Sequence, residues 1–338
     1  MEFPFLFAVC RAGVEPLLKG EMAQRHGERL VPAFMRPQLV TWKAGKPLPE
    51  DFDPGLSFAR HWGFSFGLVP APGEIPARWT EAMGDFAGLP ARWDVYPRLV
   101  PDGGVSPEIW QEADAIRGQL PTAGSGSWVG EVILGEPGVP LLVGGRRLVG
   151  AGPVSPGGLA RVNLPPESPS RAWLKLEQAL AWVGWDEESR WKGKRAIELG
   201  SAPGGISLAL VRRGLHVEAV DPAPMHPSVL AEIGPGGARV HHRRQSAGRF
   251  LSENREGPVD LLVSDMNLAP PAVLRYLERL QAAVRARRWI ITLKLNDAAM
   301  ISRLPHFRER LGRVAPQPVR VLQLPANRQE VMVIAGEG

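Results

Sequence analysis

Short apolar runs alternate with helix-like segments throughout the second half of the chain. From about residue 194 onward these runs are rich in β-branched residues and are bounded by turn residues, as strands are. Strands that alternate with helices specify a parallel sheet with crossover helices, so we expect an α/β fold. The seven candidate strands are 195–199, 216–221, 239–242, 259–265, 289–295, 319–324 and 330–334.

The last two candidate strands are separated only by the short loop 325–329. A loop of this length joins antiparallel neighbours, because a parallel connection needs a dozen or more residues. We therefore expect a seven-stranded mixed sheet that is parallel apart from a terminal hairpin.

A helix is expected just before this block. The Ser-Pro-Ser sequence at 168–170 is a helix start, since proline is tolerated in the first turn, where its missing N–H would be unpaired. Apolar residues then recur at helical spacing, at Trp173, Leu176, Leu180 and Val183. Lys175 lies off this apolar face and is free to point toward whatever the helix borders.

The first 160 residues show a weaker pattern. A strand-like run at 5–10 and a possible helix at 14–26 precede a region rich in Pro, Gly and Trp, which favours an α+β arrangement. Among the tryptophans, Trp173 and Trp289 occupy core-like positions. Trp62 and Trp128 are candidates for a surface role, such as stacking on unpaired bases.

Composition narrows the class of protein. A length of 338 residues allows two or three domains, and 44% hydrophobic with 22% charged residues excludes a wholly disordered chain. No apolar run approaches the roughly 20 residues that span a bilayer, and no signal peptide is recognisable, so we expect a cytoplasmic protein. The single cysteine, Cys10, excludes an intramolecular disulfide and a thiolate metal site, and we expect no bound metal.

The net charge is only weak evidence about the binding partner of the protein. A formal charge of +5 with a pI near 9.7 permits attraction to a polyanion such as RNA. Many proteins of this charge bind no polyanion, so the total alone identifies no partner.

A glycine-rich turn follows the first candidate strand and opens a helix. Glycines at this place let the backbone approach a nucleotide-type ligand at the carboxyl edge of the sheet. The candidate cofactor-binding residues of the turn are Glu198, Gly200, Ser201, Ala202, Pro203, Gly204 and Gly205. Asp221 ends the next strand about 20 residues on, where a carboxylate accepts hydrogen bonds from ribose hydroxyls.

Two cofactor classes share this geometry, and the turn itself favours one of them. A pyrophosphate cradle prefers a second glycine where Ala202 stands, which argues against a nicotinamide-dependent oxidoreductase. S-adenosylmethionine has no phosphate and needs an uncrowded turn lined by carbonyl groups. The turn therefore favours methyl transfer, although a tight turn with a strand-end cap would also account for these residues.

Two charged residues end other strands at the expected carboxyl edge. Asp265 closes the apolar run 259–264, and Lys294 lies within the run 290–295. A charge at the end of a buried strand is costly unless it is paired. Either the two residues pair structurally or an active site uses them.

The chemistry suits transfer of a methyl group to a ribose 2′-hydroxyl. This hydroxyl is a poor nucleophile and needs a nearby base or a group that polarises it. Lysine acts as a base only when neutral, and a second cation with partial desolvation would lower the pKa of Lys294. Lys175 is the available second cation, and Asp265 could orient Lys294 without taking the proton.

At these positions the sequence resembles the FtsJ-like family of RNA 2′-O-methyltransferases. The family's catalytic Lys-Asp-Lys-Glu tetrad matches Lys175, Asp265, Lys294 and Glu330 in order and spacing. The segments 168–177, 220–225 and 328–331 are more similar still to the ribosomal RNA large subunit methyltransferase M family, as are 10–15 and 58–62. That resemblance implies S-adenosylmethionine as cofactor and a cytidine of 23S ribosomal RNA as substrate.

The resemblance also implies an architecture. It implies a ferredoxin-like module at 1–66, a shortened THUMP-like RNA-binding region at 67–155, and a Rossmann-like class I methyltransferase domain at 156–338. Ser246 stands where the family has an aspartate that holds the adenine amino group, so Ser246 joins the candidate cofactor residues. In this scheme Lys294 is base or polariser, and Glu330 orients the substrate or a lysine.

One alternative of a different class remains. A catalytically lapsed protein could keep the fold and serve as an RNA-binding or ribosome-assembly factor. Retention of all four tetrad positions argues against this alternative, because drift would erode them.

Overall fold

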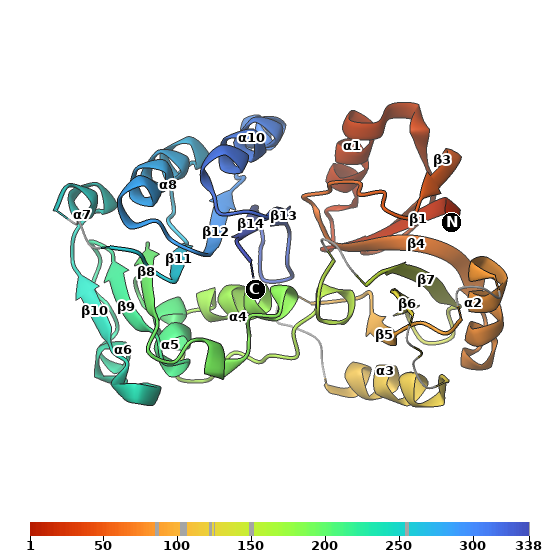
Figure 1. Cartoon of the computed structure of the whole chain (residues 1–338), viewed down its shortest axis with the longest axis horizontal. Coiled ribbons are helices and arrows are strands. Elements are labelled where there is room, and N and C mark those ends of the chain that lie inside the picture. The colour runs from red at the N-terminus through yellow and green to blue at the C-terminus, as the bar shows by residue number, and fades with distance from the viewer. Residues whose placement is uncertain are drawn as a thin grey trace. The chain divides into compact units, whose positions relative to one another are not determined.

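The computed structural model describes residues 1–84, 88–101, 107–121, 124, 126–148, 152–253 and 257–337. The chain divides into two compact units, which are described separately (Figure 1). The amino-terminal unit comprises Met1–Arg161 with Gln323–Pro325, and the carboxy-terminal unit comprises Val162–Leu322 with Ala326–Gly338.

The amino-terminal unit is built on a seven-stranded sheet. Its strand order is β2-β3-β1-β4-β7-β6-β5, and neighbouring strands are antiparallel except for the parallel pair β5 and β6. The strands are β1 (Glu2–Cys10), β2 (Leu30–Arg36), β3 (Leu39–Pro49), β4 (Ala59–Val69), β5 (Arg92–Pro97), β6 (Trp128–Leu134) and β7 (Leu141–Arg147). The helices are α1 (Glu15–His26), α2 (Ile75–Met83) and α3 (Pro107–Gln119).

Strand β4 joins the two halves of this sheet. It pairs with β1 on one side and with β7 on the other, so one continuous sheet spans residues expected in two separate modules. Strand β4 also runs across the expected module boundary at residue 66. The division into modules at 1–66 and 67–155 stays a prediction.

Buried polar groups in this unit are held by hydrogen bonds. The Glu131 carboxylate is fully buried and accepts from Tyr96 Oη at 2.6 Å and from Arg146 Nε at 2.7 Å, with His61 Nε2 at 2.8 Å. Trp128 is 3% exposed in this core, so the expectation of a surface role for Trp128 was wrong. Its place in a Gly/Ser-rich stretch suggested exposure, but strand β6 is buried along its whole length.

The carboxy-terminal unit contains the α/β sheet expected from the sequence. Its strand order is β10-β9-β8-β11-β12-β14-β13, with β14 antiparallel to both of its neighbours and the others parallel. The strands are β8 (Arg195–Leu199), β9 (His216–Val220), β10 (Val240–Arg243), β11 (Leu261–Ser264), β12 (Trp289–Lys294), β13 (Val319–Leu322) and β14 (Glu330–Ala335). The seven expected strands and the terminal hairpin are confirmed.

Helices connect and flank these strands (Figure 1). They are α4 (Ala172–Val183), α5 (Gly205–Arg212), α6 (Pro227–Ala231), α7 (Ala247–Glu253), α8 (Pro270–Val284), α9 (Ala298–Ser302) and α10 (Leu304–Val314). Helix α4 begins at Ala172, slightly later than the Ser-Pro-Ser sequence indicated. Trp173, Leu176 and Leu180 are buried on it as expected.

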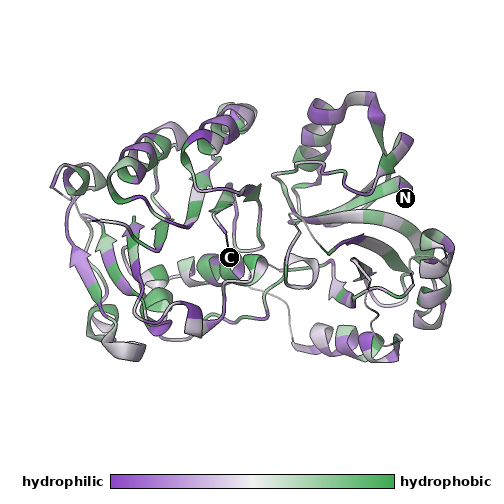
Figure 2. Cartoon of the chain, viewed as in Figure 1, coloured by the Kyte–Doolittle hydropathy of each residue, from purple (hydrophilic) through white to green (hydrophobic). Residues whose placement is uncertain are grey.

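The sheet of this unit is apolar in its middle, and the helices carry polar faces (Figure 2). Strands β11 and β14 are buried at every position, because helices cover a parallel sheet and leave little of it in contact with water. The chain order reverses between β8 and β11, which is where ligands bind in open α/β sheets. Among the residues described, no helix is long and apolar enough to cross a membrane.

Candidate active site

The carboxyl ends of three parallel strands meet at one edge of this sheet. Strand β8 ends at Leu199, β11 at Ser264 and β12 at Lys294. Strand β14 runs the opposite way, so its first residue, Glu330, reaches the same edge and pairs in register with Lys294. The terminal hairpin thus returns an acidic residue from the end of the chain to the edge that carries the glycine turn.

Two lysines and two carboxylates form a closed ring at this edge. Lys175 Nζ lies 2.9 Å from Asp265 Oδ2 and 2.7 Å from Glu330 Oε1. Lys294 Nζ lies 2.8 Å from Asp265 Oδ1 and 2.6 Å from Glu330 Oε2. Each lysine bridges both carboxylates, so charges of opposite sign alternate around the ring.

The ring is largely withdrawn from water. The side chains of Lys175, Asp265, Lys294 and Glu330 are between 7% and 15% exposed. Removing four charges from water would be costly, but their mutual contacts and a net charge of zero offset much of that cost. Each of the four side chains keeps a small exposed fraction.

The charge state of Lys294 differs from the sequence-based expectation. Burial lowers the pKa of Lys294, but contact with Asp265 and Glu330 outweighs burial and raises this pKa above its ordinary value. The expectation of a lowered pKa was wrong, because it counted the positive charge of Lys175 but not the combined charge of the two carboxylates, Asp265 and Glu330, that contact Lys294. Lys294 is an ammonium at neutral pH.

Two further residues hold the ring in place, and sequence reasoning did not find them. Gln178, on α4 one turn beyond Lys175, accepts a hydrogen bond from the Ala326 amide at 2.8 Å. Asn327 is fully buried and donates to Glu330 Oε1 at 3.4 Å. Helix α4 therefore supplies one lysine and also anchors the loop that leads to Glu330. No local motif in the sequence marks either Gln178 or Asn327.

Two glycines of the turn occupy positions where no side chain would fit. Gly200 has φ +78°, and a Cβ there would lie 2.7 Å from the Met266 Cα. Gly204 has φ +114°, and a Cβ there would meet the Met225 sulfur at 2.4 Å. Side chains are excluded at both places by conformation and by space, so backbone lines this part of the edge.

Asp221 shapes the same turn. Its carboxylate accepts hydrogen bonds from the Ala202 amide at 3.2 Å and from the Ala223 amide at 2.8 Å. Ser201 is 3% exposed, and its Oγ is buried without a hydrogen-bond partner among the residues described. A buried hydroxyl without such a partner, in a turn lined by backbone, fits a polar ligand such as S-adenosylmethionine.

Glu198 is a buried carboxyl just behind the turn. Burial raises its pKa to about 8, the Ser207 hydroxyl bond opposes the shift, and the charges of Asp265 and Asp221 reinforce it. Ser207 donates to Glu198 Oε2. Glu198 is therefore largely protonated at neutral pH in this structure.

Ser246 lies at the start of α7 rather than inside a closed pocket. It is exposed, and its Oγ accepts from the Arg249 amide at 3.3 Å, as a helix-capping residue does.

No group of three or more His, Cys, Asp or Glu side chains with metal-binding geometry occurs in the described part of the chain.

Comparison with known proteins identifies the family to which the chain belongs. Residues 169–301 match the model of the FtsJ-like methyltransferase family. Over 96% of its length, the chain is 30% identical to the ribosomal RNA large subunit methyltransferase M of Halorhodospira halophila, of which it covers 95%. The chain belongs to the ribosomal RNA large subunit methyltransferase M family. It is therefore a methyltransferase that uses S-adenosylmethionine, and the expectation of methyl transfer is confirmed.

Other members of the family match over shorter stretches. The methyltransferase M of Azoarcus sp. is 31% identical over 60% of this chain, and the chain covers 58% of that protein. That of Edwardsiella ictaluri is 38% identical over 41% of this chain, which covers 36% of that protein. Among solved structures, TrmN from Thermus thermophilus aligns over 98% of this chain and 99% of its own, at 16% identity and a TM-score of 0.35.

Proposed function

We propose that the protein transfers a methyl group from S-adenosylmethionine to the 2′-hydroxyl of a cytidine ribose in 23S ribosomal RNA. The observation that carries the proposal is the ring of Lys175, Asp265, Lys294 and Glu330 at the edge that bears the glycine turn. In this proposal the amino-terminal unit, with its ferredoxin-like and THUMP-like parts, binds the RNA.

The cofactor residues follow from the geometry of the turn. Gly200 and Gly204 allow the tight turn and Ser201 offers a buried hydroxyl, which supports this assignment. In the proposal the Asp221 carboxylate accepts hydrogen bonds from ribose hydroxyls. When bound, S-adenosylmethionine supplies an electrophilic methyl group on a sulfonium. Glu198, Ala202, Pro203, Gly205 and Ser246 complete the set proposed to surround it.

Lys294 is proposed as the group that polarises the 2′-hydroxyl. Because its ammonium is already fully protonated, it cannot accept the hydroxyl proton. It can donate a hydrogen bond to the 2′-oxygen and fix the direction of the oxygen lone pair. Lys294 could serve as a polariser or as a base, and its contacts with Asp265 and Glu330 favour the polariser.

The hydroxyl proton needs another acceptor. Methyl transfer would break the bond between the methyl carbon and sulfur, leave S-adenosylhomocysteine, and make this proton strongly acidic. The carboxylate of Asp265 or water would accept it. Lys175 and Glu330 act as positioning residues. Lys175 holds the Glu330 carboxylate, and Glu330 in turn holds the Lys294 ammonium.

The proposal is tested by methyl transfer in solution. Purified protein is incubated with methyl-labelled S-adenosylmethionine and protein-free 23S ribosomal RNA, and the modified nucleoside is identified after digestion. We expect 2′-O-methylcytidine from the wild type and none from Lys294→Ala, with cofactor binding by calorimetry unchanged. An unimpaired rate in Lys294→Ala would remove the assignment of Lys294, and base methylation would overturn the proposed reaction.

A further inference from the structure

One hairpin of the amino-terminal unit concentrates positive charge. Residues 29–49, which we call the basic hairpin, contain Arg29, Arg36, Lys43 and Lys46 and no acidic residue. Residues 1–161 as a whole hold fifteen Lys and Arg against seventeen Asp and Glu, a net charge of −2. The hairpin contributes +4 to this total, so the rest of the unit carries −6.

The cations of the basic hairpin are exposed, and none of them forms a close ion pair within the described part of the chain. Arg36 acts on the Glu136 carboxylate only from a longer distance. The region 67–155 is different, although the family resemblance implies that it binds RNA. It holds six arginines, and all six form ion pairs. Its net charge is −4, with ten acidic residues. Cations already paired within the protein are poor phosphate ligands, because binding would first have to break those pairs.

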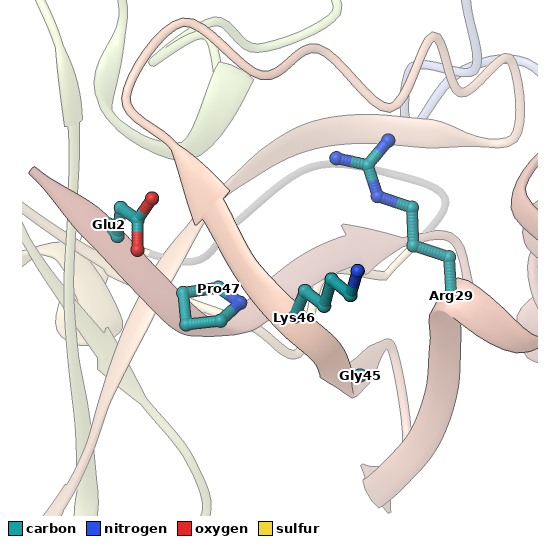
Figure 3. A pocket seen from close by; sticks show the side chains of 5 residues that line it. All are labelled: Glu2, Arg29, Gly45, Lys46 and Pro47. Atoms are coloured by element: carbon teal, nitrogen blue, oxygen red, sulfur yellow. The ribbon is translucent and has the colours of Figure 1, made fainter.

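Part of the basic hairpin lines a hollow. Arg29, Gly45, Lys46 and Pro47 line a hollow of about 760 Å³, together with Glu2. Figure 3 shows the Lys46 side chain extending toward the side where Arg29 lies, with Glu2 on the opposite side of the hollow. The Arg29 guanidinium lies over the Phe52 ring, 5.1 Å from its centroid.

Apolar side chains accompany these charges on the hairpin. Lys43 pairs in register with Phe5 on β1 and with Val31 on β2, so the three side chains form a row on one face of the sheet. Phe5 and Val31 are 37% and 55% exposed. The Arg36 guanidinium lies over the Phe34 ring at 4.5 Å. Lysine and arginine beside accessible aromatic rings are typical of surfaces that bind single-stranded nucleic acid.

We propose that the basic hairpin binds the sugar-phosphate backbone of the RNA substrate, with Arg29 and Lys46 holding one phosphate in their hollow. This inference rests on the proposed function for its ligand. It assigns the main electrostatic contact of the amino-terminal unit to residues 29–49 rather than to 67–155. Strand β2 is an edge strand, so an RNA chain can approach the hairpin from its open side.

The test compares two double variants of the full-length protein. Arg29→Gln/Lys46→Gln removes two charges from the hollow. Arg78→Gln/Arg117→Gln removes two charges from exposed ion pairs in 67–155 and is the matched control. RNA affinity is measured with protein-free 23S ribosomal RNA over a range of salt concentrations, and S-adenosylmethionine affinity and melting temperature are measured for both variants.

We expect the hairpin variant to bind RNA roughly 5- to 50-fold more weakly near 0.1 M salt, with the slope of log K against log salt reduced by about 1 to 2. Its KM for RNA should rise while kcat and cofactor affinity stay unchanged, and the control should change less than about 2-fold. Equal losses in both variants, or a larger loss in the control, would overturn the proposal.

The two proposals fail in different ways. A wild-type protein that binds RNA through the hairpin but transfers no methyl group contradicts the proposed function alone. A wild-type protein that methylates RNA, with a hairpin variant of unchanged KM, contradicts the hairpin proposal alone. A wild-type protein that binds no RNA contradicts both.

Discussion

Lys294 and Glu330 face each other across the antiparallel strands β12 and β14, with Lys294 Nζ 2.6 Å from Glu330 Oε2. This contact exists because β14 reverses direction within an otherwise parallel sheet. The reversal brings an acidic residue to an edge where Asp265 already lies. Two carboxylates at one lysine keep that lysine charged, and this decides what it can do chemically.

The pH dependence of turnover distinguishes a polarising lysine from a basic one. Because the pKa of Lys294 is raised, its ammonium persists through the neutral and mildly alkaline range. We expect kcat measured at saturating RNA and cofactor to stay level from about pH 7 to pH 9. A tenfold rise in kcat per pH unit over this range would instead mean that the neutral amine is the active form.

Asp221 is expected to control cofactor affinity. Its carboxylate organises the glycine turn through two amides, and in the proposed function it accepts hydrogen bonds from ribose hydroxyls. Asp221→Asn should weaken S-adenosylmethionine binding by about 10- to 100-fold in calorimetry, a loss of about 1.4 to 2.7 kcal/mol. Glu218→Gln on the same strand, whose carboxylate pairs with His241 and Arg243, is the control and should change affinity less than 2-fold.

Gln178 is expected to affect catalysis through Glu330. Gln178→Leu removes the acceptor of the Ala326 amide and lets the loop before Glu330 shift, so kcat should fall about 10-fold and stability by about 1 to 3 kcal/mol. Gln178→Glu retains an acceptor oxygen and should recover part of kcat. A purely structural role predicts a lower melting temperature in Gln178→Leu with kcat unchanged below the transition.

The stability of the fold should depend on pH through the ionisation of Glu198. A carboxyl whose pKa is raised to about 8 by burial stabilises the fold fully below its unfolded value near 4.5, and this contribution is lost as pH rises to 8. Glu198→Gln cannot ionise, so its melting temperature relative to wild type should increase between pH 5 and pH 8.5. Scanning calorimetry without cofactor should show an increase of about 8 to 15 °C, corresponding to about 4 kcal/mol, because each unit of pKa shift is worth about 1.4 kcal/mol. An unchanged difference across this range would contradict the raised pKa.

The sequence predicted the strands of the carboxy-terminal unit well, because β-branched runs and short loops specify them locally. The amino-terminal unit was less predictable, since its long-range antiparallel pairings leave little local pattern. Asp265 and Lys294 could be chosen from their places at strand ends, whereas Lys175 and Glu330 required the family resemblance.

The ring itself could not be predicted. Its closure depends on Glu330 lying in register with Lys294 and on α4 crossing the same edge, and both are tertiary relationships. The missed carboxylate contact reversed the expected direction of the Lys294 pKa. Gln178 and Asn327 carried no recognisable motif, because their roles depend on a loop whose position only the fold defines.

The central claim is most directly tested by mapping ribose 2′-O-methylation along the ribosomal RNA of cells that carry the wild-type gene, lack it, or carry Lys294→Ala. We expect one methylated cytidine of the large-subunit RNA to be lost both without the gene and with Lys294→Ala, and to be present with the wild type. A map that is identical in all three would contradict the proposed function.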